Sequence, residues 1–533
     1  MNLIEDKWIP ITTVSGDNKL IAPWELTDVT DPPVELNCPR PDFQGGLYQF
    51  LIGLLQTCFA PQDEEEWLRF WQSPPADLEL KDAFEIASTA FELHNPEGPA
   101  FLQDFDLPEG EQKSISALLI EAPGGKTLKD NLDHFVKGGK VNNACPSCTA
   151  SALFTLQTNA PSGGVGHRVG LRGGGPLTTL LIPSKPDANL WQKLWLNVLS
   201  KPELSADLKA SSVNIFPWLA PTRTSDKKGV TTTPADTHSL QMYWGMPRRI
   251  RLSIPQKTEG QCDLCGTRSD SLFSHFITKN YGVNYDGEWV HPLTPYRFDP
   301  KKQDLPLSLK GQQGGLGYRH WLGLNFQDQG NGDCAASVTQ FFNNERANLL
   351  EDAGELNSQS AQLWCFGYDM DNMKARCWYE SRMPHLYIDP EFQDEFTQFV
   401  SKLITAAKDT LGATRSQIKA AWFSRPKDAK GDLSMIDQAF WQATEPTFYQ
   451  QLNRLSQLPA ATRTMPPSIA KAWHSWLTKT AENQFDQWVM GSGIEDMDMK
   501  RVIQSRESLK HQLRKLKSLN LLYKIAQLEE TEA

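Results

Sequence analysis

The sequence predicts an α+β protein with a large mixed N-terminal domain over residues 1–385 and a C-terminal helical bundle over residues 386–533. Two observations predict this division. Short β-like runs alternate with turns rich in Gly, Pro, Asn and Asp in the first region, whereas the second region repeats apolar residues at helical spacing. A chain of 533 residues is long enough for two or three domains with a sizeable core.

Both helices and strands are expected in the N-terminal domain. The apolar stretch 47–59 has helical length, and acidic residues at 63–66 precede Trp67 and Phe70, as in the first turn of a helix. Short β-like runs follow at 177–182 and 250–254, separated by turn-forming residues. The domain therefore mixes both kinds of element.

The C-terminal region is predicted to be a series of amphipathic helices. Phe392, Phe396, Phe399 and Val400 recur at the i, i+4, i+7 and i+8 positions of one buried helical face. Comparable stretches, punctuated by prolines, cover residues 416–423, 435–458, 468–490 and 500–528. A helical bundle is the natural packing for such a series.

Two Cys-x-x-Cys pairs are the most informative motif of the N-terminal domain: Cys145 with Cys148, and Cys262 with Cys265. One such pair could be a redox pair or a chance spacing, but two pairs together supply the four thiolates of a tetrahedral Zn²⁺ site. A site closed by four sulfurs leaves no open coordination position. We therefore predict structural rather than catalytic zinc, which would join the two ends of the segment between the pairs.

A glycine-rich run lies between the two cysteine pairs, over residues 161–175. Because glycine has no Cβ, a backbone built from it can lie very close to a ligand. Taken alone, the run fits a flexible surface loop as well as it fits a binding loop.

The composition bounds the function. The net charge of −11 argues against non-specific coating of nucleic acid by the whole surface, although clusters such as Arg248, Arg249 and Arg251 leave room for a local basic site. Nine cysteines, five of them outside the pairs, fit a reducing compartment better than a disulfide framework. With no visible signal peptide and no apolar run of membrane-spanning length, we expect a cytoplasmic protein without membrane contact.

Recognisable catalytic signatures are absent from the sequence. Residues 124–127 end like a Walker A motif, but the pattern requires glycine where Ile120 stands. There is also no His-Glu-x-x-His, no Gly-x-Ser-x-Gly and no dinucleotide-binding glycine motif between a strand and a helix. We therefore expect no enzymatic activity. The alternative that stays open is a zinc-containing nuclease or another nucleic-acid-processing enzyme.

Several dispersed segments are jointly specific: residues 2–10, 38–40, 145–148, 152–161, 170–174, 262–265, 289–295 and 367–372. In this order they resemble the CasA family, the large subunit of the type I-E CRISPR surveillance complex called Cascade. The resemblance covers essentially the whole chain, including the helical C-terminal region.

The resemblance implies a role in antiviral defence. Members of the family recognise a short protospacer-adjacent motif (PAM) in double-stranded DNA through the minor groove. They promote strand separation and R-loop formation, and they help recruit the helicase-nuclease that degrades the target, without a catalytic site of their own. The implied partners are the other Cascade subunits, the 5′ handle of the CRISPR guide RNA, the target DNA and the helicase-nuclease.

The resemblance also implies which residues read the motif. The family's glycine loop falls on Ser162, Gly163, Gly164, Val165 and Gly166, of which Ser162 and Val165 depart from an all-glycine loop. A glycine backbone can approach the floor of the minor groove, where the amino group of guanine is the main obstacle. The two departures leave the preferred motif open.

Three further elements follow from the resemblance. The lysine finger that enters the minor groove falls on Lys279 or Asn280, and the gapless match places Asn280 at the finger position. The amide wedge that splits the first base pair falls on Asp371 and Asn372, where Asn372 is shorter than the family's Gln; a simple turn is the alternative. Phe135 stands at the position that contacts the guide-RNA handle, with a buried core residue as the alternative.

Overall fold

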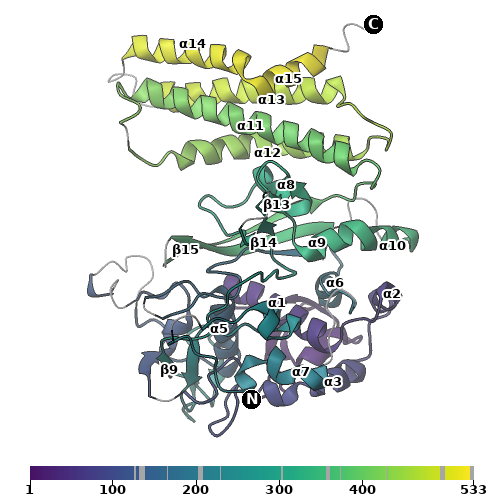
Figure 1. The fold of residues 1–533 in the computed structure, drawn as a ribbon, viewed down its shortest axis with the longest axis vertical. Helices are drawn as coiled ribbons and strands as arrows, with labels where there is room; N and C mark the ends of the chain where they lie inside the picture. The colour runs from purple at the N-terminus through teal and green to yellow at the C-terminus, as the bar shows by residue number, and fades with distance from the viewer. Residues whose placement is uncertain are drawn as a thin grey trace. The chain divides into compact units, whose positions relative to one another are not determined.

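The computed structural model describes residues 1–527 except 108, 125–127, 131–137, 165, 202–207, 228–229, 258, 300, 302–303, 356–360, 372–373, 429 and 492–497. The described residues pack into two units. The first combines Met1–Gln313 with Gly332–Pro384, and the second combines Gly314–Asn331 with His385–Ala533. Strands and helices mix in the N-terminal region, and long helices make up the C-terminal region (Figure 1), so the predicted α+β fold class is confirmed.

The second unit takes in residues 314–331, which the sequence-based domain boundaries place in the first domain. Within this segment the Tyr318 ring stacks on Phe448 at 4.3 Å, and its hydroxyl lies 2.8 Å from the Thr444 hydroxyl. A buried aromatic ring with a satisfied hydroxyl is a strong packing contact, and it joins the segment to the helices. The boundaries 1–385 and 386–533 themselves stay a prediction.

A buried helix lies at the centre of the first unit. Helix α1 (Pro41–Cys58) has proline in its first turn, where the missing N–H costs no helical hydrogen bond, and its residues are buried on nearly all sides. Its Phe50 ring makes edge-to-face contacts with Trp8 and Phe154. The predicted apolar stretch 47–59 corresponds to this helix.

The acidic residues before Trp67 begin a helix, as predicted. The Asp63 carboxylate caps α2 (Glu64–Gln72) by accepting a 2.9 Å hydrogen bond from the Glu66 amide. The Trp67 indole N–H donates to the Trp195 carbonyl at 3.1 Å, which ties α2 to α6 (Leu190–Trp195). Further α-helices among the described residues of this unit are α3 (Asp77–Glu85), α5 (Pro146–Asn159), α7 (Leu208–Ile215), α9 (Ser337–Phe341) and α10 (Ala347–Asp352).

Three small sheets hold the segments of interest. Their orders are β2-β1-β3, β4-β9-β6 and β15-β14-β5. The predicted runs 177–182 and 250–254 correspond to β5 and β6, and β5 is buried along its whole length. The strands are β1 (Ile9–Thr13), β2 (Asn18–Ile21), β3 (Pro33–Leu36), β4 (Glu111–Ser114), β5 (Thr178–Pro183), β6 (Arg249–Leu252), β9 (His275–Lys279), β14 (Ala361–Asp371) and β15 (Lys374–His385).

Shorter strands complete the first unit. β7 (Gly260–Gln261) pairs with β8 (Arg268–Ser269) in a two-stranded ribbon. β10 (Tyr296–Arg297) pairs with both β11 (Leu307–Ser308) and β13 (Asp333–Cys334).

The second unit is a helical bundle, as predicted. Its long helices are α11 (Gln393–Trp422), α12 (Ser434–Ser456), α13 (Pro467–Phe485), α14 (Met499–Lys515) and α15 (Lys517–Ala526), and the short α8 (Trp321–Asn325) belongs to the same unit. Phe396, Phe399 and Val400 are buried, as their spacing indicates. The stretch 416–423 is not a separate helix: α11 continues through Gly412, where a Cβ would meet only open space. Among the described residues, no helix combines the length and apolar character that a membrane crossing requires.

Candidate metal centre and nucleic-acid interface

The two cysteine pairs form one cluster. The Sγ atoms of Cys145, Cys148, Cys262 and Cys265 all lie within 4.8 Å of one another, and those of Cys145 and Cys265 are 3.7 Å apart. Zn–S bonds of ~2.3 Å place the sulfurs of a tetrahedral site ~3.8 Å apart, whereas a disulfide brings two sulfurs to ~2.0 Å. The spacing therefore fits four thiolates around one metal ion, and it does not fit two disulfides.

Secondary structure places both pairs. Cys145 is the N-cap of α5, so Cys148 lies in the first turn of that helix. The second pair occupies the tight turn between β7 and β8, where the Gly266 amide donates a 2.9 Å hydrogen bond to the Cys262 carbonyl. Three of the four cysteines are buried, and Cys265 is exposed.

Hydrogen bonds outside the sulfurs hold the two turns together. The Asp263 carboxylate accepts hydrogen bonds from the backbone amides of Asn142 at 2.8 Å and Asn143 at 2.9 Å. Next to them, Ala144 forms an isolated antiparallel bridge with Phe273. The ligand atoms are thus preorganised by the backbone, which is the arrangement expected of a structural metal site.

The glycine loop of residues 162–166 lies against the end of β9. The Tyr281 amide donates a 2.7 Å hydrogen bond to the Gly166 carbonyl. A Cβ on Gly166 would lie 2.9 Å from both the ring and the backbone nitrogen of Tyr281, and Gly166 has a φ of +77°. Glycine is therefore required here by backbone conformation and by close approach. This contact joins the loop to the predicted finger residues Lys279 and Asn280.

Tyr281 is fixed from its other side as well. Its carbonyl accepts a 3.1 Å hydrogen bond from the Ser225 amide, and the Ser225 hydroxyl accepts a 2.7 Å hydrogen bond from Arg168. Tyr281 has a φ of +64°, which is uncommon for a residue with a side chain. The hydrogen bonds on both sides hold this strained conformation.

A basic residue lies beneath the loop. A Cβ on Gly163 would lie 3.3 Å from the Arg248 guanidinium, and the same guanidinium donates a hydrogen bond to the Pro161 carbonyl. Burial lowers the pKa of Arg248 to about 10, and burial together with Arg248 lowers the pKa of His167. Among the described residues, no hydrogen-bond acceptor faces the buried Arg248 Nε. Positive charge is therefore concentrated under the loop.

The second half of the glycine run folds back over the end of α5. The Gly170 amide donates to the Ala160 carbonyl at 3.0 Å, and the Gly175 amide donates to the Asn159 carbonyl at 3.2 Å. These bonds satisfy carbonyls that the end of a helix leaves unpaired. A Cβ on Gly175 would lie 2.7 Å from the Met370 side chain, so the glycine run also contacts β14.

β14 leads to the hairpin tip predicted as the wedge. Asp371 is the last residue of β14 and is exposed, whereas Asn372 lies outside the described residues. The Arg376 guanidinium on β15 donates to both carboxylate oxygens of the buried Asp369, at 2.8 and 2.9 Å. This paired contact across the hairpin holds its two strands in register just before the tip.

The predicted finger residues lie at the end of β9. Lys279 is exposed and stands opposite Arg249 in the register of β6 and β9, while Asn280 is half-buried. The structure thus brings the glycine loop and the finger together through Tyr281, and it brings the glycine run to the hairpin through Gly175. Two other predicted residues, Val165 and Phe135, lie outside the described residues.

Sequence reasoning missed Tyr281 and the particular role of Arg248. The basic cluster of Arg248, Arg249 and Arg251 is visible in the sequence, but only the fold shows how each charge is used. Arg249 forms an ion pair with Asp104, and Arg251 donates to backbone carbonyls. Arg248 is the member of the cluster that lies under the loop. No sequence signal distinguishes Tyr281, because its strained φ depends on tertiary contacts.

The fold is shared with solved structures of CRISPR proteins. The chain matches Thermus thermophilus CasA (Cse1) with a TM-score of 0.69 and 19% identity, over 97% of this chain and 99% of that chain. It matches Thermobifida fusca Cse1 with a TM-score of 0.68 and 16% identity, over 98% of both chains. A chain from a structure described as a CRISPR RNA-guided surveillance complex matches with a TM-score of 0.66 and 14% identity, over 96% and 99%.

The family relationship rests on sequence. The family model described as CRISPR-associated protein Cse1 matches residues 2–484. This range includes both cysteine pairs, the glycine loop, the β14–β15 hairpin and most of the helical bundle. The chain therefore belongs to the Cse1 family, also called CasA, the large Cascade subunits that its sequence motifs resemble.

Proposed function

We propose that this chain is the large, non-catalytic subunit of a type I-E CRISPR surveillance complex and that it reads the PAM in double-stranded DNA through the minor groove. One observation supports this proposal above the others. The hydrogen bond from the Tyr281 amide to the Gly166 carbonyl makes one rigid element of a glycine loop and the strand end that carries Lys279. A glycine backbone without side chains can enter a narrow groove, and the exposed Lys279 ammonium beside it is attracted to the anionic phosphates.

The chemistry of the groove explains the arrangement. A·T and G·C pairs differ in the minor groove mainly by the guanine amino group, so a backbone that lies near the groove floor discriminates by steric exclusion. Ser162 and Gly164 are exposed and available for such an approach. Arg248 and Lys279 supply positive charge near the phosphates, which adds affinity without sequence preference.

The hairpin supplies the second half of the proposal. Asp371 ends β14 just before the tip, and the Arg376–Asp369 pair holds the two strands together beside it. We propose that the Asn372 amide enters the duplex beside the PAM and starts strand separation and R-loop formation. Opening a base step costs a few kcal/mol, so a wedge needs a rigid support.

The remaining partners belong to the same proposal. The surveillance-complex chain that shares this fold makes a role among other Cascade subunits and a guide RNA the natural one for this chain. We propose that Phe135 stacks on the 5′ handle of the guide RNA and that the complex recruits the helicase-nuclease. Zn²⁺ held by Cys145, Cys148, Cys262 and Cys265 would be structural, because four sulfur ligands leave no coordination position for a substrate.

The test uses the complex assembled with guide RNA and a DNA library in which the PAM positions are randomised. Enrichment of a defined motif is expected for the wild-type chain. Gly163→Asp should abolish enrichment, because the new carboxylate would meet the crowded space at Arg248 and His167 and would repel phosphates, while assembly with guide RNA survives. A wild-type complex that enriches no motif would refute the proposal. DNA cleavage by the isolated chain with a divalent metal would favour the nuclease alternative.

A further inference from the structure

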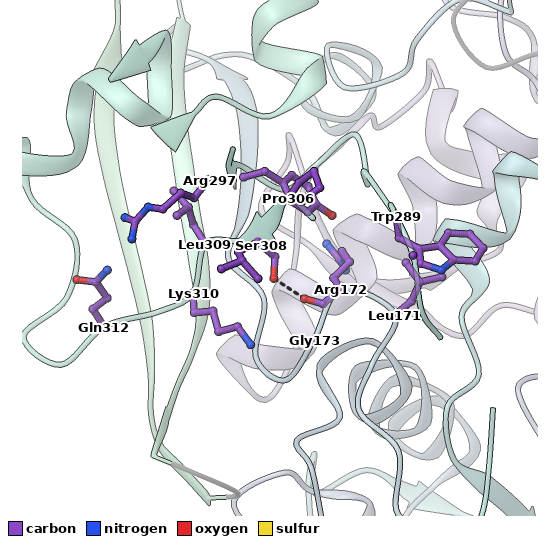
Figure 2. Close-up of a pocket in the computed structure, with 13 residues that line it drawn as sticks. Leu171, Arg172, Gly173, Trp289, Arg297, Pro306, Ser308, Leu309, Lys310 and Gln312 are labelled. Atoms are coloured by element: carbon purple, nitrogen blue, oxygen red, sulfur yellow. Dashed lines mark hydrogen bonds between the residues drawn. The ribbon is translucent and has the colours of Figure 1, made fainter. Parts of the chain in front are cut away.

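A cavity of about 430 Å³ lies beside the glycine run, and its described lining residues include three basic ones, Arg172, Arg297 and Lys310, and no acidic one. Figure 2 shows the Lys310 ammonium pointing toward Gly173. A Cβ on Gly173 would lie 2.9 Å from that nitrogen, so the missing side chain opens the space that the ammonium faces. Gly173 has a φ of +80°, a conformation that favours glycine.

Two of the three basic side chains of this cavity, Arg172 and Lys310, have no carboxylate partner among the described residues. The Arg172 guanidinium is buried, and its hydrogen bonds go to neutral oxygens of Gln49, Thr178 and Thr294. Among the described residues, no carboxylate forms an ion pair with Lys310, and desolvation lowers the pKa of its ammonium. Of the three cations, Arg297 has a carboxylate partner, Asp333.

Buried charges in proteins are normally paired, because an unpaired charge loses its hydration without compensation. Arg172 is a buried charge of this kind, whereas Lys310 is exposed, and among the described residues neither side chain forms an ion pair with a carboxylate. The cavity wall also contains a hydrogen-bond donor without a partner. Among the described residues, the buried Trp289 indole N–H has no acceptor. The wall is therefore rich in donors and positive charge, which is the chemistry of an anion site.

The position of the cavity indicates where an anion would come from. Lys310 forms a bridge with Pro176, directly after the glycine run, and Gly311 forms a bridge with Asp369 on β14. The wall that carries Lys310 is thus bonded both to the segment that follows the glycine loop and to the hairpin below its tip. Figure 2 also shows the Ser308 hydroxyl donating a hydrogen bond to the Arg172 carbonyl, which joins β11 to the glycine run.

We propose that this cavity binds a phosphate group through Lys310 and Arg172, and that in the assembled complex this group is a backbone phosphate of the target DNA. That the phosphate belongs to DNA rests on the proposed function. That the cavity binds a phosphate rests only on the charge and hydrogen-bond donors of its wall. A point charge such as a lysine ammonium suits one phosphate contact, which positions the duplex without reading its sequence.

The test measures affinity for a duplex at several salt concentrations with the assembled complex. Each phosphate neutralised adds about 0.9 to the slope of log affinity against log salt, so Lys310→Gln should lower the slope by about that amount, equally on duplexes with and without the motif. Lys310→Arg should keep the slope. Lys301→Gln is the matched control, an exposed lysine on the connection that leads into β11, outside the cavity wall.

Inorganic phosphate provides a second arm with the isolated full-length chain. Titration followed by calorimetry should show binding to wild type that Lys310→Gln removes. Phosphate binding without a change in DNA slope would overturn the DNA source and leave a site for a free anion. No effect in either arm, or an equal effect of Lys301→Gln, would overturn the proposal. A wild-type complex without motif preference would refute the proposed function alone, because the slope is measured on any duplex.

Discussion

Replacing Gly166 by alanine tests whether the glycine loop reads DNA as a rigid backbone. The change adds one Cβ that would lie 2.9 Å from the backbone nitrogen of Tyr281 and 2.9 Å from its ring. Neither atom can yield easily, because the Tyr281 amide donates to Gly166 and its carbonyl accepts from Ser225. The loop therefore has to move away, and the hydrogen bond between Gly166 and Tyr281 has to lengthen or break.

The magnitude follows from a matched glycine in the same loop. Gly164 also has a positive φ, +64°, but a Cβ there would meet nothing within 4 Å. Both alanine variants carry the conformational strain of an L-residue in this region, about 1–2 kcal/mol. Only Gly166→Ala adds the clash and the loss of a hydrogen bond, which together cost about 1–2 kcal/mol more, or roughly 5–30-fold in affinity.

The assay compares affinities of the assembled complex for a duplex with the preferred motif and for one without it, at one fixed salt concentration. We expect Gly166→Ala to lose roughly 5–30-fold more motif preference than Gly164→Ala, with little change in non-specific affinity. Equal losses in the two variants would refute the reasoning, because the contact with Tyr281 would then play no part in reading the motif.

Two further predictions concern the hairpin and the helical unit. Asn372→Ala should weaken binding to fully paired targets and spare targets mismatched beside the PAM, where no base pair has to be opened; equal loss on both DNAs would make Asn372 a general contact. Burial lowers the pKa of His320 and of His385 from an ordinary 6.5 to about 3. The unfolded chain then binds more protons than the folded chain below pH 6.5, so the second unit should lose about 1 kcal/mol of stability per histidine between pH 6.5 and 5.5. Urea unfolding followed by helical circular dichroism checks this, and a flat profile would contradict it.

Local patterns were enough to predict the helices and several strands. The spacing of Phe396, Phe399 and Val400 gives the buried face of α11 directly, because one face of a helix repeats at a fixed interval. The docking of residues 314–331 onto the helical unit could not be predicted, since it depends on the ring of Tyr318 meeting Phe448, which lies 130 residues later in the chain. The break expected before residue 416 is absent for a related reason: propensity alone did not show that α11 continues through Gly412.

The candidate site was predicted in part for the same physical reasons. Four cysteines in two short pairs limit the possible geometry so strongly that their meeting follows from spacing and chemistry. The glycine loop was placed by resemblance, but its fixed points, Tyr281 and Arg248, are contacts between segments distant in the chain. A strained φ at Tyr281 leaves no mark in the sequence, because the surrounding hydrogen bonds create it.

Two chain segments start at the cysteine cluster and meet again at the glycine loop, and we call them the two arms. From Cys145 the chain runs through α5, 14 residues or about 21 Å long, and reaches the loop directly after it. From Cys265 the chain runs through β8 and β9 and reaches Lys279 and then Tyr281. Zinc at the cluster would therefore fix the angle between these two arms. A small change of this angle at the cysteine cluster would displace the glycine loop, because the loop lies at the other end of the arms.

This geometry predicts that damage to the metal site impairs motif preference before it impairs folding stability. Structural zinc contributes ~10–16 kcal/mol to the folding of small peptides, but here the turns are also held by Asp263 and by the bridge of Ala144 with Phe273. We expect Cys148→Ser to bind less zinc than the one ion per chain expected of the wild type. We also expect it to lose most of its motif preference while its melting temperature changes little, because reading the motif needs positioning within about 0.5 Å. Ser147→Ala is the control, because Ser147 lies in the same turn and supplies no sulfur. Wild-type protein without zinc, or a variant that unfolds before motif preference declines, would show that the cluster does not act through the two arms.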